Sequence, residues 1–361
     1  MNFPVVDYVK IASNLLPGKI SHLVLFVTSR CNNACKYCFN WQNQDIAYTR
    51  DELSIQEIGK IAKNFKNLMC LSITGGEPTL RDDMPEICRI FYSCGTRLLQ
   101  FHSNGYMPDR LAEMVSEISD TCPQMHIDTC ISLDGVGIGN DEIRKAHNSF
   151  KNILMSVKLI DGMRKKNKRL GLEINTTYSY FTKKNMDKLY SFVTEGLGLS
   201  YNVALVRGKA RDESAREVSI AEYRDFMRAH FNYTKKTFSR KYPFHSFVAA
   251  IRKLSAEISI ETLSRQDKIL PCLAGKKILV VYDTGEVHPC EMLGRSIGNL
   301  RDFGYDLNRL MGTTMARTTV KSIKKNKCYC SWECVIPVNL IFNWKGAYMI
   351  VKRWISDCLS R

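Results

Sequence analysis

The chain has 361 residues, is 45% hydrophobic and carries a formal net charge of +16. This length allows one large core and a second, smaller domain, and the sequence contains neither a solenoid repeat nor a low-complexity tract. The basic balance favours an acidic partner, but no zinc-finger, RNP or helix-turn-helix signature accompanies it, so nucleic-acid binding is not expected.

Strand-like apolar runs recur along the first half of the chain, beginning near residues 23, 68, 97, 126, 170 and 201. Each run is followed by a stretch compatible with a helix, and such repeating βα units predict parallel strands with right-handed crossovers. We therefore expect an α/β fold, a partial (βα)6 barrel resembling a TIM barrel, over residues 21–210 after a lead-in at 1–20. A doubly wound sheet is the alternative.

Three cysteines follow the first strand-like run with the spacing C-x3-C-x2-C, at Cys31, Cys35 and Cys38. Three thiolates on one short loop can hold three irons of a four-iron cube and leave the fourth iron open for an outside ligand. A zinc site would need four protein ligands, and no fourth ligand lies nearby in the sequence. The loop therefore predicts an incomplete iron–sulfur site.

Polar turns follow the later strand-like runs. Thr74-Gly75-Gly76-Glu77-Pro78 comes directly after the second run, and its glycines would let the backbone approach a ligand closely. The segments 102–105 and 131–135 come after the third and fourth runs. Because α/β folds collect their ligands at the carboxyl ends of strands, we expect these turns to share one binding site.

Together these motifs resemble the radical S-adenosylmethionine (SAM) family, over roughly residues 20 to 334. The resemblance implies a 4Fe-4S cluster on the three cysteines and a SAM molecule whose cleavage yields a 5′-deoxyadenosyl radical. That radical would abstract a hydrogen atom from a substrate. The cofactor contacts implied are Tyr37, Gly75, Gly76, Glu77, Ser103, Asn104, Ser132, Asp134, Arg144 and Leu205.

Two positions in this resemblance stand out. Arg144 suits the cofactor carboxylate because a guanidinium group binds a carboxylate through two hydrogen bonds. Asn140 stands where many relatives have a histidine, so we expect this corner of the site to be reshaped.

Strand signals stop between residues 211 and 268, where apolar residues recur with helical spacing and predict a helical bridge. A hairpin is then expected around Asp283-Thr284-Gly285, with five cysteines near it. Residues 269–335 resemble the SPASM or twitch extensions of radical SAM enzymes, which implies one auxiliary 4Fe-4S cluster. The expected ligands are Cys272, Cys290, Cys334 and either Cys328 or Cys330.

Two further hypotheses concern this extension. A structural zinc site is the alternative for the five cysteines, since thiolate sets suit either metal. Glu291, directly after Cys290, is the candidate catalytic base by analogy with an acid at that point in some relatives.

The C-terminal tail, residues 336–361, is apolar, aromatic and basic, a mixture that also suits a membrane interface. We expect packing against the barrel instead, through one helical face that consists of Ala347, Val351, Trp354, Ile355 and Cys358.

The predicted function is radical SAM chemistry on a peptide or a small molecule, with an acidic flavodoxin or ferredoxin as reductant. The alternative is a non-catalytic iron–sulfur or zinc protein with a basic face for nucleic acid or a partner. Fourteen cysteines without a recognisable signal peptide indicate a reducing cytoplasm rather than a disulfide framework.

Overall fold

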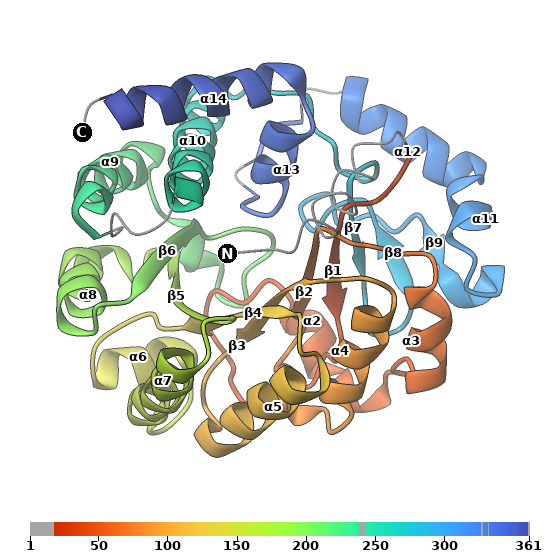
Figure 1. Ribbon diagram of the computed structural model, residues 1–361, viewed down its shortest axis with the longest axis horizontal. Coiled ribbons are helices and arrows are strands. Elements are labelled where there is room, and N and C mark those ends of the chain that lie inside the picture. The colour runs from red at the N-terminus through yellow and green to blue at the C-terminus, as the bar shows by residue number, and fades with distance from the viewer. Residues whose placement is uncertain (1–17, 238–242, 326–327, 331, 360–361) are drawn as a thin grey trace.

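The computed structural model describes residues 18–237, 243–325, 328–330 and 332–359 (Figure 1). Its centre is a nine-stranded sheet in the order β6-β5-β4-β3-β2-β1-β7-β8-β9. The first six strands are parallel and follow one another in chain order. They are β1 (His22–Phe26), β2 (Cys70–Thr74), β3 (Leu98–Ser103), β4 (His126–Ser132), β5 (Leu170–Tyr178) and β6 (Ser200–Leu205).

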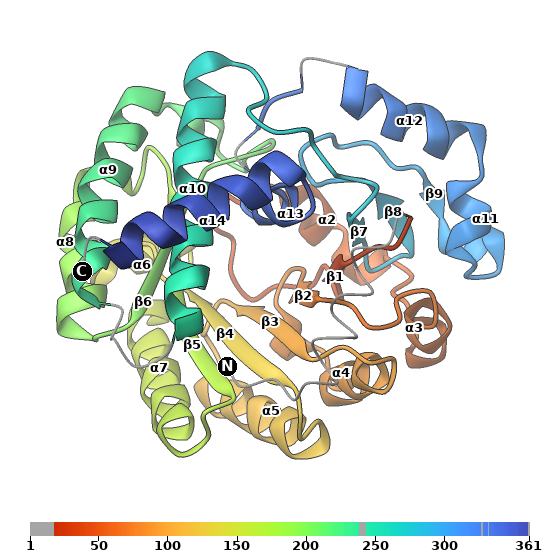
Figure 2. The same ribbon diagram turned by 45° about the horizontal axis from the view of Figure 1, so that its top comes forward.

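This strand order confirms the predicted α/β fold with an open, partial barrel. A doubly wound sheet would reverse its strand order at a switch point, and no reversal occurs among β1 to β6. The helices that follow the strands lie on the outside of the sheet (Figures 1 and 2). They include α3 (Ile55–Ala62), α4 (Met84–Ser93), α5 (Pro108–Thr121), α7 (Ser149–Lys166) and α8 (Met186–Ser191).

The main core lies between the sheet and these outer helices. Strand β5 shows how it is built, because Leu170, Leu172 and Ile174 are buried and belong to that core. Glu173 and Asn175 alternate with them and therefore point to the opposite, inner face. The inner face of the barrel is thus partly polar.

The predicted hairpin forms, but it is part of the barrel sheet. Strand β7 (Ile278–Val281) pairs in parallel with β1, with His22 opposite Ile278. Strands β8 (Glu286–His288) and β9 (Gly298–Asn299) then continue the sheet in antiparallel fashion. The cysteine-rich extension therefore shares its hydrogen-bonded framework with the barrel.

Helices cover the side of the barrel that the sheet leaves open. Helices α9 (Ile220–Thr237) and α10 (Pro243–Arg265) lie within residues 211–268, and α13 (Val335–Ile341) and α14 (Trp344–Leu359) pack with α10. Figure 2 shows α14 crossing in front of α10. The predicted lead-in lies outside the described residues except for its last three positions.

The expected packing face of α14 is wrong. Of that face only Trp354 is partly buried, whereas the buried residues are Gly346 and Ile350. Gly346 lies so close to α13 that a Cβ there would be 2.4 Å from the Leu340 carbonyl oxygen. Close backbone contact at a glycine therefore sets the orientation of the helix, which an apolar stripe alone could not reveal.

None of the helices in the described part of the chain is long and apolar enough to cross a membrane.

Candidate active site

The three-cysteine loop follows β1 and is tied to two distant segments by backbone hydrogen bonds. The amide of Ala34 donates to the Arg144 carbonyl oxygen (3.2 Å), and the amide of Lys36 donates to the Ile143 carbonyl oxygen (3.0 Å). The carbonyl oxygen of Lys36 in turn accepts from the Asp212 amide (2.8 Å). The loop is therefore held between the segment after β4 and the segment after β6.

The Gly75-Gly76 turn packs directly on the start of this loop. The Gly76 amide donates to the Thr28 carbonyl oxygen (2.7 Å). A Cβ on Gly75 would be 2.2 Å from the Thr28 oxygen, and one on Gly76 would be 2.1 Å from the Arg30 oxygen. The two glycines therefore let the turn lie close to the protein's own cysteine loop, in addition to the close approach to a ligand that the sequence suggested.

Glu77 is fully buried at the end of this turn. Its carboxylate accepts hydrogen bonds from the Ser103 hydroxyl (2.8 Å), the Asn104 amide (2.7 Å) and the hydroxyl and amide of Thr79. Burial raises the pKa of Glu77, and these hydrogen bonds oppose the shift. The predicted site residues after β2 and β3 therefore form one connected group.

A second polar group lies after β4. Arg144 and Asp134 form an ion pair, both almost fully buried, and Arg144 also donates to the Tyr37 hydroxyl (3.1 Å). Tyr37 lies between two cysteines of the loop, so this group reaches the predicted metal site. Leu205, at the end of β6, is only partly buried.

Asn140 holds the backbone of this second polar group in place. It is fully buried, accepts a hydrogen bond from the Asp134 amide (3.0 Å) and donates to the Ser149 hydroxyl (3.2 Å). The departure noted at this position therefore has a structural role, which is to fix the backbone at Asp134.

The three loop thiols have the properties needed for a cluster. Desolvation raises the pKa of Cys31 and Cys38 to about 12, so the thiolate forms are stable only beside a strongly positive centre such as iron. Among the described residues, no three Cys, His, Asp or Glu side chains converge on a single metal ion. A four-iron cube differs because it offers a separate iron to each thiolate. Three thiolates without a fourth protein ligand on the loop suit such a cluster, whereas a structural zinc site takes four protein ligands.

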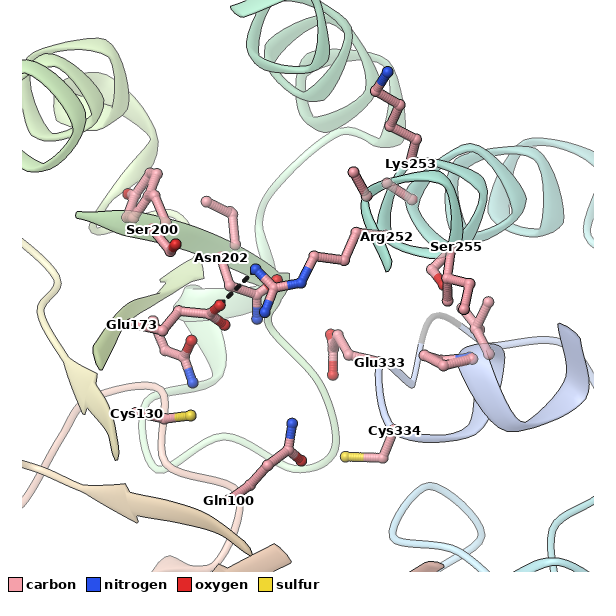
Figure 3. A pocket seen from close by; sticks show the side chains of 18 of the residues that line it. Gln100, Cys130, Glu173, Ser200, Asn202, Arg252, Lys253, Ser255, Glu333 and Cys334 are labelled. Carbon is pink, nitrogen blue, oxygen red and sulfur yellow. Dashed lines mark ion pairs between the residues drawn. The ribbon is translucent and has the colours of Figure 1, made fainter. Parts of the chain in front are cut away.

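The second cysteine group divides into two parts. Cys272, Cys290, Cys328 and Cys330 lie close enough to interact, since the pKa of Cys290, raised mainly by burial, is also raised by Cys272 and Cys330. The pKa of Cys272 is raised likewise by Cys328. Cys334 instead lines the cavity inside the barrel, where its thiol is drawn in Figure 3.

Arg207 connects the barrel to both sides of the cysteine-rich extension. It follows β6 and forms ion pairs with Glu291 (2.9 Å) and with Glu333. Each glutamate is the sequence neighbour of a predicted ligand, Cys290 or Cys334. Burial raises the pKa of Glu291 while Arg207 lowers it, so the predicted base is already held by a cation. No motif in the sequence indicates the role of Glu333.

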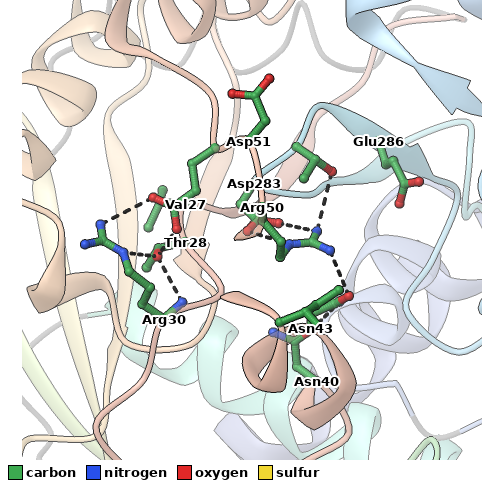
Figure 4. A network of polar contacts seen from close by, with 12 residues as sticks. Val27, Thr28, Arg30, Asn40, Asn43, Arg50, Asp51, Asp283 and Glu286 are labelled. Carbon is green, nitrogen blue, oxygen red and sulfur yellow. Dashed lines mark hydrogen bonds and ion pairs between the residues drawn. The ribbon is translucent and has the colours of Figure 1, made fainter. Parts of the chain in front are cut away.

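A polar network supports the segment that follows the cysteine loop (Figure 4). Arg50 donates from Nη2 to Asp283 Oδ1 (2.7 Å) and from Nε to Asp283 Oδ2 (3.0 Å). It also donates to Asn43 (3.1 Å), on helix α2 (Trp41–Asp45). Because Asp283 lies in the turn between β7 and β8 and is fully buried, this paired contact fixes the loop against the hairpin.

A cavity of about 610 Å³ occupies the inside of the barrel (Figure 3). Its walls come from the inner faces of β3 to β6 and from α9, α10 and the Cys334 segment. Figure 3 shows Gln100, Cys130, Asn202 and Cys334 around this space, with the ion pair of Arg252 and Glu173 (2.7 Å) on one side. The volume is in the range typical of small-ligand sites.

Sequence reasoning missed the polar residues of this cavity. The signal was present as strict alternation, since Leu99 and Phe101 are buried in the outer core while Gln100 and His102 line the cavity. In a parallel sheet covered on both faces, near-continuous apolar runs are expected, so polar residues at alternate positions indicate a functional interior.

Comparisons with known proteins agree with this geometry. The model of the radical SAM superfamily matches residues 25–192. An AdoMet-dependent heme synthase of Methanosarcina barkeri (strain Fusaro / DSM 804) is 25% identical over 288 residues, which are 76% of this chain and 78% of that protein.

Two solved structures have a similar fold. Native anSMEcpe with bound AdoMet and Cp18Cys peptide superposes with a TM-score of 0.59 at 16% identity, covering 94% of this chain and 98% of that chain. Streptococcus suis SuiB bound to precursor peptide SuiA gives a TM-score of 0.56 at 17% identity, covering 85% of this chain and 69% of that chain.

Proposed function

Because this chain belongs to the radical SAM superfamily and is a radical SAM enzyme, we propose that it modifies an amide-bearing substrate, a peptide or protein side chain, in its barrel cavity. The observation that carries this proposal is the junction of the three-cysteine loop with the Gly75-Gly76-Glu77 turn at the carboxyl ends of β1 and β2. The cavity lies inside the same barrel, and although the junction itself does not line it, His102 does and directly precedes Ser103, which donates to Glu77.

We assign the cluster to Cys31, Cys35 and Cys38. When bound there, a 4Fe-4S cluster with SAM supplies one-electron chemistry that generates a 5′-deoxyadenosyl radical. The SAM contacts are proposed for the two polar groups described above, with Tyr37 and Leu205 on the adenine side. These contacts are Gly75, Gly76, Glu77, Ser103, Asn104, Ser132, Asp134 and Arg144.

The protein's own tasks are binding, orientation and exclusion of water. Arg144 is held by Asp134 and Tyr37, so its orientation is fixed before a ligand binds. Glu77 keeps its position through four hydrogen bonds, which reduces the reorganisation needed when an amino group binds nearby. The helices that close the barrel side limit the access of water to the cavity.

The cavity lining supports an amide-bearing substrate. Three carboxamides, Gln100, Asn175 and Asn202, come from the inner faces of β3, β5 and β6. The oxygen of Gln100 already accepts from Ser72 (2.8 Å), which leaves its amino group as a donor. The buried Asn175 oxygen has no hydrogen-bond partner in the described residues. Such donors and acceptors match the two ends of an amide group.

The cationic side chains that line the cavity are already paired. Arg252 contacts Glu173 (2.7 Å), Arg164 contacts Asp161 (2.6 Å) and Lys253 contacts Asp357 (2.8 Å). A highly anionic substrate would therefore have to displace existing ion pairs. This favours a neutral group over a phosphorylated or polycarboxylate small molecule.

The auxiliary site is proposed for Cys272, Cys290, Cys328 and Cys330, with one 4Fe-4S cluster. Burial is the main cause of the raised pKa of Cys272, Cys290 and Cys330, and the charges of neighbouring thiols of this set add to it, which supports this set over the one that includes Cys334. An acidic flavodoxin or ferredoxin stays the predicted reductant because the chain has a net charge of +16.

The decisive experiment is anaerobic reconstitution with iron and sulfide, followed by dithionite and SAM, with 5′-deoxyadenosine as the product measured. We expect the reconstituted protein to form it and the triple variant Cys31→Ala/Cys35→Ala/Cys38→Ala to form none. The matched control is Cys358→Ala, at an exposed cysteine far along the chain, which should keep the parent rate. Equal product from the triple variant would refute the assignment.

A further inference from the structure

The outer face of α14 carries an apolar stripe that no described residue covers. Its members recur every three or four residues and are exposed to different degrees. They are Trp344 (76%), Tyr348 (65%), Val351 (45%), Ile355 (49%) and Leu359 (84%). Figures 1 and 2 show α14 on the outside of the molecule, and large contiguous apolar patches of this kind usually mark an interaction surface.

The opposite face of α14 fixes the direction in which this stripe points. Gly346 and Ile350 are buried, and the ring of Trp354 meets that of Phe247 edge-on with centroids 5.8 Å apart. Asp357 forms an ion pair with Lys253 on α10 (2.8 Å). The helix cannot roll to bury the stripe without losing these contacts, so the exposure belongs to the folded state.

The charges around the stripe identify its partner. Lys345 and Lys352 are exposed and lie along one border of the stripe. Helix α12 (Thr314–Lys325), a separate part of the surface, also carries exposed cations and contains no acidic residue. These cations are Arg317, Lys321, Lys324 and Lys325.

A second copy of the chain is a poor occupant, because two molecules of net charge +16 would bring like charges together at this face. An anionic lipid surface instead satisfies both features. Tryptophan and tyrosine favour the boundary between headgroups and acyl chains, and lysines beside them meet the phosphates.

We propose that the α14 stripe docks the enzyme onto an anionic lipid surface, with the helix lying in the plane of the interface. Trp344 and Tyr348 occupy the headgroup boundary, Val351, Ile355 and Leu359 reach the first acyl carbons, and Lys345 and Lys352 contact lipid phosphate. This inference does not depend on the proposed catalytic function.

Vesicle flotation of the full chain tests the proposal. The vesicles are phosphatidylcholine alone or phosphatidylcholine with about one quarter phosphatidylglycerol, at low and high salt. We expect the protein to float with the anionic vesicles and to bind them less at high salt. Trp344 fluorescence should shift to the blue on binding.

The stripe variant is Trp344→Ser/Tyr348→Ser/Ile355→Ser, and its expected loss is about tenfold in the vesicle partition coefficient. The matched control is Tyr48→Ser/Ile138→Ser, which removes two side chains that are 89% and 76% exposed on other parts of the surface. The control should bind as the parent does, and circular dichroism should show both variants folded, since all five positions face solvent.

Three results of the flotation experiment would overturn the proposal. They are a parent protein that stays at the bottom with every vesicle, equal binding by the stripe variant, and equal binding to the uncharged vesicles. A dimer in solution that the stripe variant abolishes would identify a second copy as the occupant, and would likewise overturn the lipid assignment.

Discussion

At the scale of single residues, Asp128 shows how the polar interior of the barrel affects stability. It lies on β4 and points inward, beside Glu173 and Arg252. Burial raises its pKa from 3.8 to about 6, the charge of Glu173 raises it further, and Arg252 opposes both effects. An unfolded chain has no such burial, so the folded and unfolded states bind the proton differently.

The sign of this linkage gives a prediction for Asp128→Asn. Between about pH 4 and 6 the folded protein binds the Asp128 proton more tightly than the unfolded chain does. The ionised carboxylate therefore lowers the free energy of unfolding as the pH rises through that window, and above it the loss stays constant. The variant should therefore match the parent near pH 4 and exceed it by about 1–3 kcal/mol at pH 7.5. Urea unfolding midpoints at both pH values measure the difference.

The control for this measurement is Asp302→Asn, at an exposed position on the surface. It should show no comparable gain at pH 7.5. A stability difference for Asp128→Asn that is the same at pH 4 and pH 7.5 would contradict the explanation.

At the scale of elements, the sequence predicted those features that depend on local patterns. All six barrel strands were located from their apolar runs. The sequence also predicted that the cysteine loop and the polar turns would lie close together, because the carboxyl ends of parallel strands meet at one edge of the sheet.

Features that depend on contacts between distant segments were not predicted. The pairing of β7 with β1 joins residues more than two hundred positions apart, and no local pattern specifies such a partner. The predicted packing face of α14 was wrong because the close contact at Gly346, and not the apolar stripe, determines which face is buried. The Arg207 contacts with Glu291 and Glu333 were missed for the same reason, since they link three separate segments.

The Gly-Gly turn provides a prediction for an element. Gly76→Ala should reduce the iron bound after reconstitution, because the added carbon would be 2.1 Å from the Arg30 carbonyl oxygen and would push the cysteine loop away. Iron analysis and the visible absorption of the cluster measure this.

The matched control is Gly162→Ala, in the interior of α7, where an added Cβ meets no atom within 4 Å. It should keep the full iron content and stabilise the helix by about 0.5–1 kcal/mol. If Gly76→Ala binds iron as well as this control does, the turn does not position the loop.

At the scale of the whole molecule, barrel and cysteine-rich extension behave as one unit. They share a sheet through β1 and β7, and they share ion pairs through Arg50 with Asp283 and Arg207 with Glu291. The two proposed cluster sites are therefore expected to be coupled structurally, although they lie on different segments of the chain.

Arg207→Met tests this coupling. It would leave Glu291 and Glu333 facing each other without a cation, and their repulsion should separate the two cysteine segments. We expect the variant to lose roughly half of the bound iron, that of the auxiliary site, while the first cluster retains its electron paramagnetic resonance signal.

The comparison variant is Arg216→Met, which removes an exposed arginine whose ion pair with Glu213 is weak (4.0 Å). Its iron content should equal that of the parent. Unchanged iron in Arg207→Met would show that the extension holds its cluster without the arginine.

The open edge of the sheet has a mechanical consequence. In the described chain β6 hydrogen-bonds to β5 alone, and the remaining wall of the cavity is attached by side chains, such as the Tyr223 hydroxyl on the Val203 carbonyl oxygen (3.4 Å). Such side-chain contacts break at a lower free-energy cost than the backbone hydrogen bonds between neighbouring strands, so the helical side of the barrel opens more easily than the sheet. A long chain could enter by moving this helical side outward, while every parallel strand, and with it the cysteine loop, keeps its register.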